Sequence, residues 1–189
     1  MLIRKLFKAE MAHIVPGAYS TRCQHIHGHS YKFELFLRGD EPNDSQMVID
    51  FKAIKDRGIY DFFDSFDHAV MLWEKDPRVK IIERMNPDRN IVVPFIPTAE
   101  MMAKAFFLVC QSIIETGSPL SGERNVSVER MVVHETDTGY AEFARPDLGR
   151  DNFPAAGLSR WRISKGICNG WREKAWYERA VRHDKKRAG

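Results

Sequence analysis

The sequence predicts an α+β fold with a four-stranded antiparallel sheet and two helices on one face of it. Three observations along the 189 residues support this prediction: two alternating segments near the N-terminus, two helical segments in the middle, and a second alternating pair after them. The order strand, strand, helix, helix, strand, strand is typical of this class. Four strands alone leave two open sheet edges, so we expect subunits to assemble through those edges.

The first two predicted strands carry histidines on their apolar faces. Residues 2–13 alternate between apolar and polar side chains, and His13 ends the strand on its apolar side. Residues 29–38 alternate in the same way, and their apolar face continues the parity of His27 and His29. We therefore expect an antiparallel pair whose long connection has a functional role.

Two helices are predicted from their caps and from apolar spacing. Asp50 is the expected N-cap of a helix over about 51–64, and Thr98 is the expected N-cap of a helix that stops near Gly117. Residues 73–97 contain four prolines, and we expect a long irregular connection there.

The last two predicted strands form a hairpin. Residues 125–135 and 140–144 alternate, and the turn sequence Asp-Thr-Gly lies between them. Glu135 ends the first of these strands. Its carboxylate is either exposed at the strand tip or directed at a ligand.

Composition excludes several classes of protein. Hydrophobic residues make up 43% and charged residues 29% of the chain, a balance typical of globular proteins. No apolar run approaches the ~20 residues of a membrane helix, and the N-terminus lacks a signal-peptide pattern. Cys23, Cys110 and Cys168 are too few and too scattered for a disulfide framework, so we expect a cytoplasmic protein.

The C-terminal residues 151–189 are basic. They hold ten Lys and Arg and four acidic residues, a net charge of +6. A basic tail can bind nucleic acid, but an extension that is solvated or forms an interface is more common, and we favour the latter. Trp161, Trp171 and Trp176 are costly to expose, so we expect the tail to pack on the body or on a neighbouring subunit.

Residues 23–29 contain the densest group of potential metal ligands. His27 and His29 are two positions apart, so in an extended chain their imidazoles point to one face and can hold one ion. Zn²⁺ is the ion that suits such imidazoles, and His13 is the third candidate ligand. The alternative interpretation is a polar turn with a structural cysteine at Cys23.

The motifs taken together resemble the 6-pyruvoyltetrahydropterin synthase / 6-carboxytetrahydropterin synthase family. They occur in the family's order between Phe7 and about Phe143, and the Cys/His cluster is the most specific of them. The motifs are Ala12-His13, Cys23-x-x-x-His27-Gly28-His29-x-Tyr31, Met47-Val48-Ile49-Asp50-Phe51, Asp67-His68, Pro97-Thr98-Ala99-Glu100 and Val133-His134-Glu135-Thr136.

This resemblance implies a tunnelling fold, in which subunit sheets join into barrels, commonly as a homohexamer. It implies Zn²⁺ held by His13, His27 and His29. It implies that Cys23, Asp67 and His68 handle protons in the reaction. Glu135 would anchor the pterin ring, and Thr98, Ala99 and Glu100 would lie near the pterin pocket.

The implied substrate is 7,8-dihydroneopterin triphosphate, and the residue types fit its chemistry. Zinc polarises hydroxyls as a Lewis acid, and a thiol beside a metal and a histidine is a competent base. Asp67 would orient His68, and Glu135 would accept paired N–H donors from the pterin edge. The sequence does not identify residues for the triphosphate.

Two branches of the family differ in product. One eliminates triphosphate and makes 6-pyruvoyltetrahydropterin. The other also releases acetaldehyde and makes 6-carboxytetrahydropterin for queuosine biosynthesis. Cys23 lies four residues before His27, which resembles the 6-carboxy branch, and we favour that product.

The chain departs from the family pattern in two places. The connection at 73–97 looks longer than usual, and the chain continues after the usual end. We therefore assign residues 1–146 to a pterin synthase-like domain and 147–189 to a C-terminal extension. A hypothesis of another class is a non-catalytic, zinc-stabilised binding module, in which the tail contacts nucleic acid.

Overall fold

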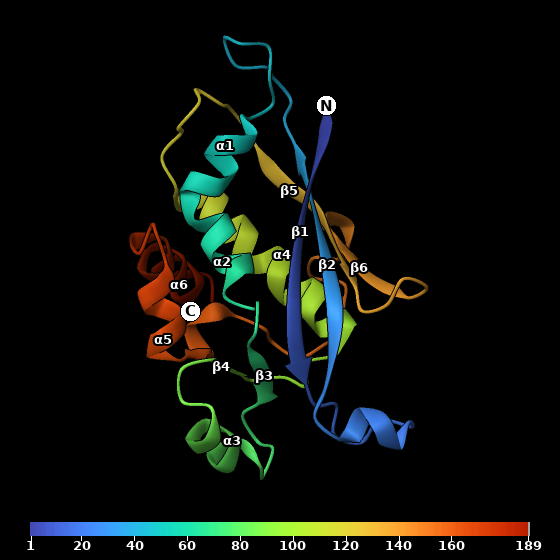
Figure 1. The fold of residues 1–189 in the computed structure, drawn as a ribbon. Coiled ribbons are helices and arrows are strands. Elements are labelled where there is room, and N and C mark those ends of the chain that lie inside the picture. Colours follow the sequence, from blue (N-terminus) through green and yellow to red (C-terminus); the bar gives the residue numbers. More distant parts are fainter. Residues whose placement is uncertain (189) are drawn as a thin grey trace.

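A seven-stranded mixed sheet organises the molecule (Figure 1). Most of the helices cover one of its faces, whereas the helix over residues 79–85 packs against Leu72 and Val92 on the opposite face. The computed structural model describes residues 1–188. The strand order is β6-β5-β2-β1-β3-β4-β7. The strands are β1 (Leu2–His13), β2 (His27–Arg38), β3 (Val70–Trp73), β4 (Asn90–Val93), β5 (Ser127–His134), β6 (Tyr140–Ala144) and β7 (Arg162–Ile163).

The four predicted strands are present, and each pairs antiparallel with its neighbour in the order β6-β5-β2-β1. The prediction of four strands in total was wrong. β3 runs parallel to β1 and covers the edge that we expected to be open, and β4 and β7 extend the sheet further. All four residues of β4 are buried, so its sequence shows no alternation from which a strand could be read.

The connection at 73–97, predicted to be irregular, contains regular structure over about half of its residues. It contains α3 (Val79–Met85) and β4, with prolines only at the joints. Short elements between prolines give too few residues for a periodic pattern, which is why the prediction failed there.

The predicted helix over about 51–64 is interrupted. It consists of α1 (Phe51–Ile54), a π-helical turn (Lys55–Ile59) and α2 (Tyr60–Asp64). Gly58 breaks it with a φ of 96°, and a Cβ at that position would clash with the ring of Trp176. The expected cap is confirmed, because the Asp50 side chain accepts a hydrogen bond from Lys52 N at 2.6 Å.

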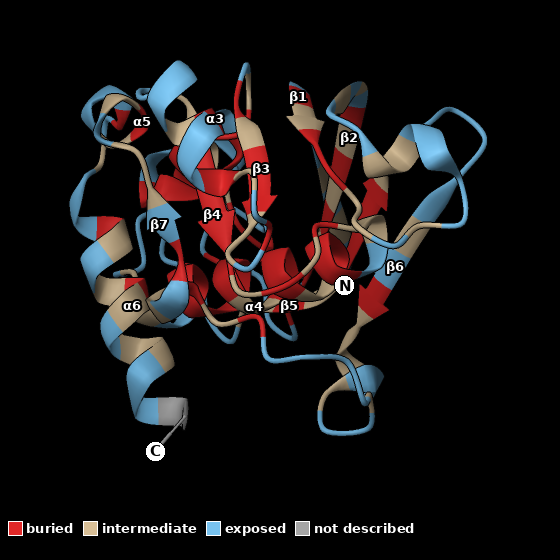
Figure 2. Cartoon of the chain, turned by 90° about the horizontal axis from the view of Figure 1, so that it is seen from below, coloured by how far each residue is buried: buried red, intermediate tan, exposed pale blue. Residues whose placement is uncertain are grey.

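α4 (Ala99–Thr116) is the central helix, and its predicted limits are confirmed. Thr98 Oγ1 accepts a hydrogen bond from Met101 N at 3.3 Å, and Gly117 follows the last turn. Figure 2 shows the buried residues gathered along α4 and the strands beside it. Cys110 lies fully buried on this helix, as an inert core thiol would, and burial raises its pKa.

The C-terminal extension packs on the body of the same chain. This is one of the two arrangements that we expected for its tryptophans, the other being contact with a neighbouring subunit. Its helices, α5 (Lys165–Gly170) and α6 (Ala175–Ala188), form an outer layer beside α2 and α4 (Figure 1). Trp161, Trp171 and Trp176 belong to the same hydrophobic core as the sheet and α4. Trp171 Nε1 also donates to Ser65 Oγ at 2.8 Å. None of the described helices is long and apolar enough to cross a bilayer.

Candidate metal centre and neighbouring cavity

The end of β1 and the start of β2 bring the three predicted metal ligands together. His13 and His27 are direct cross-strand partners, and His29 lies two residues further along β2 on the same face. One ligand nitrogen from each ring lies within 4.8 Å of the others. The three imidazoles can therefore hold one metal ion.

Backbone carbonyls fix the tautomers of two of these histidines. His13 Nδ1 lies 2.7 Å from Pro97 O, and His27 Nδ1 lies 2.8 Å from His25 O. An Nδ1–H that donates to a carbonyl leaves the Nε2 lone pair free for a metal. The two Nε2 atoms lie only 3.0 Å apart, which is favourable only when a proton or a cation lies between them.

Burial keeps this cluster in the form that a metal requires. The side chain of His13 is fully buried, and desolvation lowers its pKa below the ordinary value; desolvation also lowers the pKa of His29. His29 Nε2 is buried without a hydrogen-bond partner among the described residues. Neutral imidazoles with lone pairs directed at a common point fit a divalent cation.

Glu135 and Tyr31 complete the surroundings of the cluster. Glu135 Oε1 lies 3.3 Å from His13 Nε2 and 3.7 Å from His29 Nε2, so this carboxylate is directed at the histidines. The Tyr31 hydroxyl donates to Glu135 Oε1 at 3.3 Å and lies 3.1 Å from His13 Nε2. Sequence reasoning did not assign Tyr31 to the site, although its parity matches that of His27 and His29 and could have indicated it.

A cavity of about 340 Å³ adjoins the cluster. Five of its lining residues were predicted as site residues: Cys23, Thr98, Ala99, Glu100 and Glu135. The structure thus brings together the predicted thiol, the predicted pterin anchor and the N-terminus of α4.

The loop between β1 and β2 places Cys23 at this cavity. Cys23 lies in a short 3₁₀ helix (Thr21–Gln24), and its carbonyl accepts a hydrogen bond from Val15 N at 2.9 Å. The next carbonyl, that of Gln24, accepts from Arg78 Nη1 at 2.8 Å. Arg78 is itself held by Asp76, so the segment before α3 supports the cysteine loop.

Asp67 and His68 do not line this cavity. Asp67 Oδ1 accepts from Glu10 N at 2.9 Å, and His68 N donates to Glu10 O at 2.7 Å. The His68 side chain is 80% exposed and lies 3.6 Å from Asp67, with a φ of 56°. Within the chain this pair is therefore held at the backbone of Glu10 and does not contribute to the walls of the cavity that contains Cys23.

Two further histidines close to the motif residues, His25 and His134, lie outside the cluster. His134 Nε2 lies 2.7 Å from Glu34 Oε1, and His25 contributes only its carbonyl.

Comparison with known proteins gives consistent matches. A family model described as 6-pyruvoyl tetrahydropterin synthase matches residues 2–146. A Helicobacter pylori protein named 6-carboxy-5,6,7,8-tetrahydropterin synthase is 30% identical over 189 residues, covering 98% of this chain and 94% of that protein. A Haemophilus influenzae protein of the same name is 28% identical over 148 residues, covering 75% and 96%.

Solved structures share the fold. A Wolinella succinogenes protein described as uncharacterized aligns with a TM-score of 0.63 at 22% identity, covering 77% of this chain and 98% of its own. The 6-pyruvoyl tetrahydropterin synthase of Caenorhabditis elegans aligns with a TM-score of 0.52 at 18% identity, covering 76% and 94%. At these identities the likeness extends to the fold alone.

Proposed function

Because the chain belongs to the 6-pyruvoyl tetrahydropterin synthase family and is a lyase, we propose that it makes 6-carboxy-5,6,7,8-tetrahydropterin from 7,8-dihydroneopterin triphosphate. The reaction releases triphosphate and acetaldehyde and serves 7-deazaguanine (queuosine) biosynthesis. The observation that carries the proposal is the three-histidine cluster beside a cavity that contains both Cys23 and Glu135.

The proposed cofactor is one Zn²⁺ per chain, held by His13, His27 and His29. Three neutral imidazoles leave a fourth position open, which is the arrangement of catalytic zinc sites. When bound, the ion supplies Lewis acidity toward the hydroxyls of the substrate side chain.

The residues of the cavity have separate roles in this proposal. Glu135 anchors the pterin edge, because a carboxylate accepts paired N–H donors. Cys23 acts as the base that removes a proton from the substrate side chain. Thr98, Ala99 and Glu100 lie where the ring would rest, at the N-terminus of α4.

In this proposal the Asp67 and His68 side chains of one chain act at the Cys23 cavity of a neighbouring copy. In their own chain they are held at the backbone of Glu10 and do not line the cavity that contains Cys23, so we assign their action at that cavity to a subunit contact. A homo-oligomer, with a hexamer of joined barrels as the family expectation, supplies such contacts. In the described chain the outermost strands of the sheet are β6 and β7.

We assign the catalytic role to residues 1–146 and a supporting role to 147–189. The family model ends at residue 146, and the extension contributes buried tryptophans to the common core. All three cysteines are free thiols, which supports a reducing cytoplasm as the location.

Identification of the product by mass tests the proposal. Incubation of the zinc-loaded protein with 7,8-dihydroneopterin triphosphate should give 6-carboxytetrahydropterin together with acetaldehyde. Accumulation of 6-pyruvoyltetrahydropterin without acetaldehyde would assign the chain to the other branch. Absence of turnover would contradict the proposal outright.

A further inference from the structure

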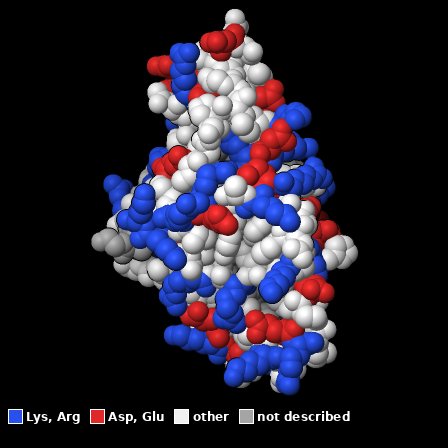
Figure 3. All heavy atoms as spheres, turned by 90° about the vertical axis from the view of Figure 1, so that its left-hand side faces the viewer, with Lys and Arg blue, Asp and Glu red and all other residues white. Residues whose placement is uncertain are grey.

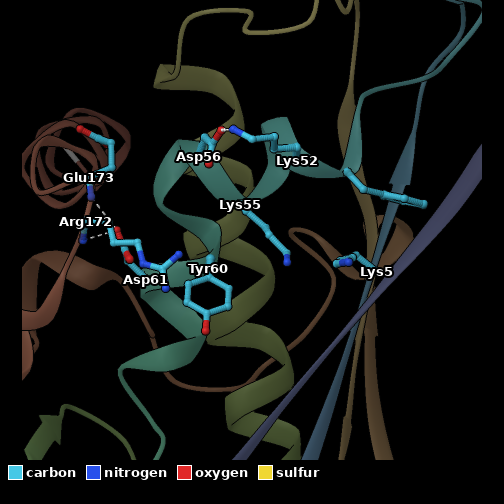
Figure 4. A pocket seen from close by; sticks show the side chains of 9 residues that line it. Lys5, Lys52, Lys55, Asp56, Tyr60, Asp61, Arg172 and Glu173 are labelled. Atoms are coloured by element: carbon cyan, nitrogen blue, oxygen red, sulfur yellow. Dashed lines mark hydrogen bonds and ion pairs between the residues drawn. The ribbon is translucent and has the colours of Figure 1, made fainter.

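A second cavity, of about 620 Å³, shares no lining residue with the cavity at the histidine cluster. It lies between the start of β1, the interrupted helix α1–α2 and the segment before α6 (Figure 4). Its walls combine cations, carboxylates and two aromatic rings. They consist of Lys5, Phe51, Lys52, Lys55, Asp56, Tyr60, Asp61, Arg172 and Glu173.

Every carboxylate of this cavity already accepts a hydrogen bond from another group of the chain. These contacts offset much of the negative charge of the carboxylates. The pairs are Asp56 with Lys52 Nζ at 2.5 Å, Glu173 with Arg179 Nη2 at 2.9 Å, and Asp61 with the backbone N–H groups of Arg172 and Glu173 at 3.0 and 2.8 Å.

Three cations of the cavity have no carboxylate partner among the described residues, and each lies over an aromatic ring. Lys5 Nζ is 5.2 Å from the ring centre of Phe51. Lys55 Nζ and the Arg172 guanidinium are 5.8 and 4.9 Å from the ring centre of Tyr60. A neutral aromatic ring does not cancel the charge of the cation and leaves the N–H groups on the far side unpaired, so these three remain available to an anion.

We propose that this cavity binds a small molecule that carries a polyphosphate group. Cations from β1, the α1–α2 segment and the C-terminal extension meet at one concave site, as recognition of several phosphoryl groups requires. Lys5, Lys55 and Tyr60 also line an adjoining cavity of about 230 Å³, which adds one further cation, Lys8, and one carboxylate, Asp64. The combined space exceeds what one phosphate fills.

The extension builds this site as much as the body does. Asp61 holds the backbone at 172 and 173, and this places Arg172 beside Tyr60 (Figure 4). Gly58, in the same turn as Lys55, lies against Trp176 of the extension, where a Cβ would clash with the ring. Figure 3 shows Lys and Arg side chains, with Asp and Glu among them, over much of the face that carries α5 and α6. The proposal is independent of the reaction proposed above.

Isothermal titration with sodium tripolyphosphate tests the proposal on the full-length protein. We expect binding that weakens as ionic strength rises. Lys55→Gln and Arg172→Gln should each raise the Kd of this site about tenfold, the usual effect of losing one charge-assisted contact. Lys80→Gln, an exposed lysine on α3, is the matched control and should leave the Kd unchanged.

Two further measurements test the proposal. A variant at Asp56 distinguishes this cavity from the histidine cluster, and a comparison with GTP identifies the class of ligand. Asp56→Asn should lower the Kd, because it frees Lys52. GTP that binds more tightly than tripolyphosphate, with the advantage lost in Tyr60→Leu, would identify a nucleotide as the ligand; equal affinities would identify free polyphosphate. Tripolyphosphate binding that is absent, or equal in all variants, overturns the proposal. Tighter binding of a single-stranded RNA with the same variant dependence also overturns it.

Discussion

Glu135 and burial act in opposite directions on the histidine that connects the two strands of the metal centre. The carboxylate favours protonated His13, whereas the removal of this imidazole from water disfavours the charge; desolvation is the larger effect and lowers the His13 pKa. At neutral pH the ring is therefore a neutral imidazole, the form that can bind a metal ion, rather than a cation. Tyr31 adds a hydroxyl that orients Glu135, and burial raises the pKa of that phenol.

Replacement of His27 by Ala should remove the metal and the activity together. Two imidazoles cannot hold the ion as three do, and His27 Nε2 is directed at His13 Nε2. Zinc content after purification is the measurement. His25→Ala is the matched control, because only the carbonyl of His25 contacts the cluster, and it should retain zinc. Full zinc occupancy in His27→Ala would show that the ligand is misassigned.

The stability of the metal-free protein should fall as the pH drops below about 6.5, the ordinary pKa of histidine. The folded-state pKa values of His13 and His29 are lowered, so the unfolded chain takes up protons first. Their contribution to stability is complete above that pH and declines as the pH falls through the folded values. Thermal unfolding between pH 5 and 8 measures this. A melting temperature that does not change over this pH range, in both the unmodified protein and His29→Gln, would contradict this prediction.

At the scale of elements, the sequence predicted those with a long periodic pattern. β1, β2 and α4 were predicted with nearly correct limits, because twelve to eighteen residues give a clear alternation or helical repeat. β3, β4 and β7 have two to four residues each and were missed. Gly58 is a local signal for the break in the α1–α2 segment, but its contact with Trp176, which lies more than a hundred positions away, could not be read from the neighbouring sequence.

The same limit applies to the candidate site. The cluster of His13, His27 and His29 follows from strand parity and could be predicted. The separation of Asp67 from Cys23 depends on the parallel pairing of β3 with β1, which no nearby residue indicates. The support of the cysteine loop by Arg78 was missed for the same reason.

Arg78→Ala should destabilise the fold and loosen the cysteine loop. The Asp76 side chain is 1% exposed and would lose its charged partner, at a cost of about 2 kcal/mol. Gln24 O would also lose its donor. Urea denaturation and the rate of alkylation of Cys23 by iodoacetamide measure the two effects. Lys80→Ala is the control in the same segment. Unchanged alkylation would show that the loop does not depend on Arg78.

At the scale of the whole molecule, the proposed division of the site between copies requires an oligomer. Light scattering at micromolar concentration should show an assembly of several chains, with a hexamer as the family expectation. A monomer would leave Asp67 and His68 without a route to Cys23, and would contradict the proposal.

Mixed variants test that division directly. Cys23→Ala and His68→Ala should each lose most of their turnover when assayed alone. If one copy supplies His68 to another copy's cavity, unfolding and refolding the two variants together should restore part of the activity, because some sites then combine both intact residues. No recovery in assembled mixtures would mean that the two residues do not share a site across a contact.

The central claim is that Cys23 performs chemistry beside the metal rather than holding it. The direct measurement is zinc content and turnover in one preparation of Cys23→Ala, with Cys168→Ala as the control. The three histidines should keep zinc and the assembly intact, while turnover falls by about 10²–10⁴-fold, the usual contribution of a positioned base. Loss of zinc would make Cys23 a structural ligand. Unchanged turnover would show that it is not the base.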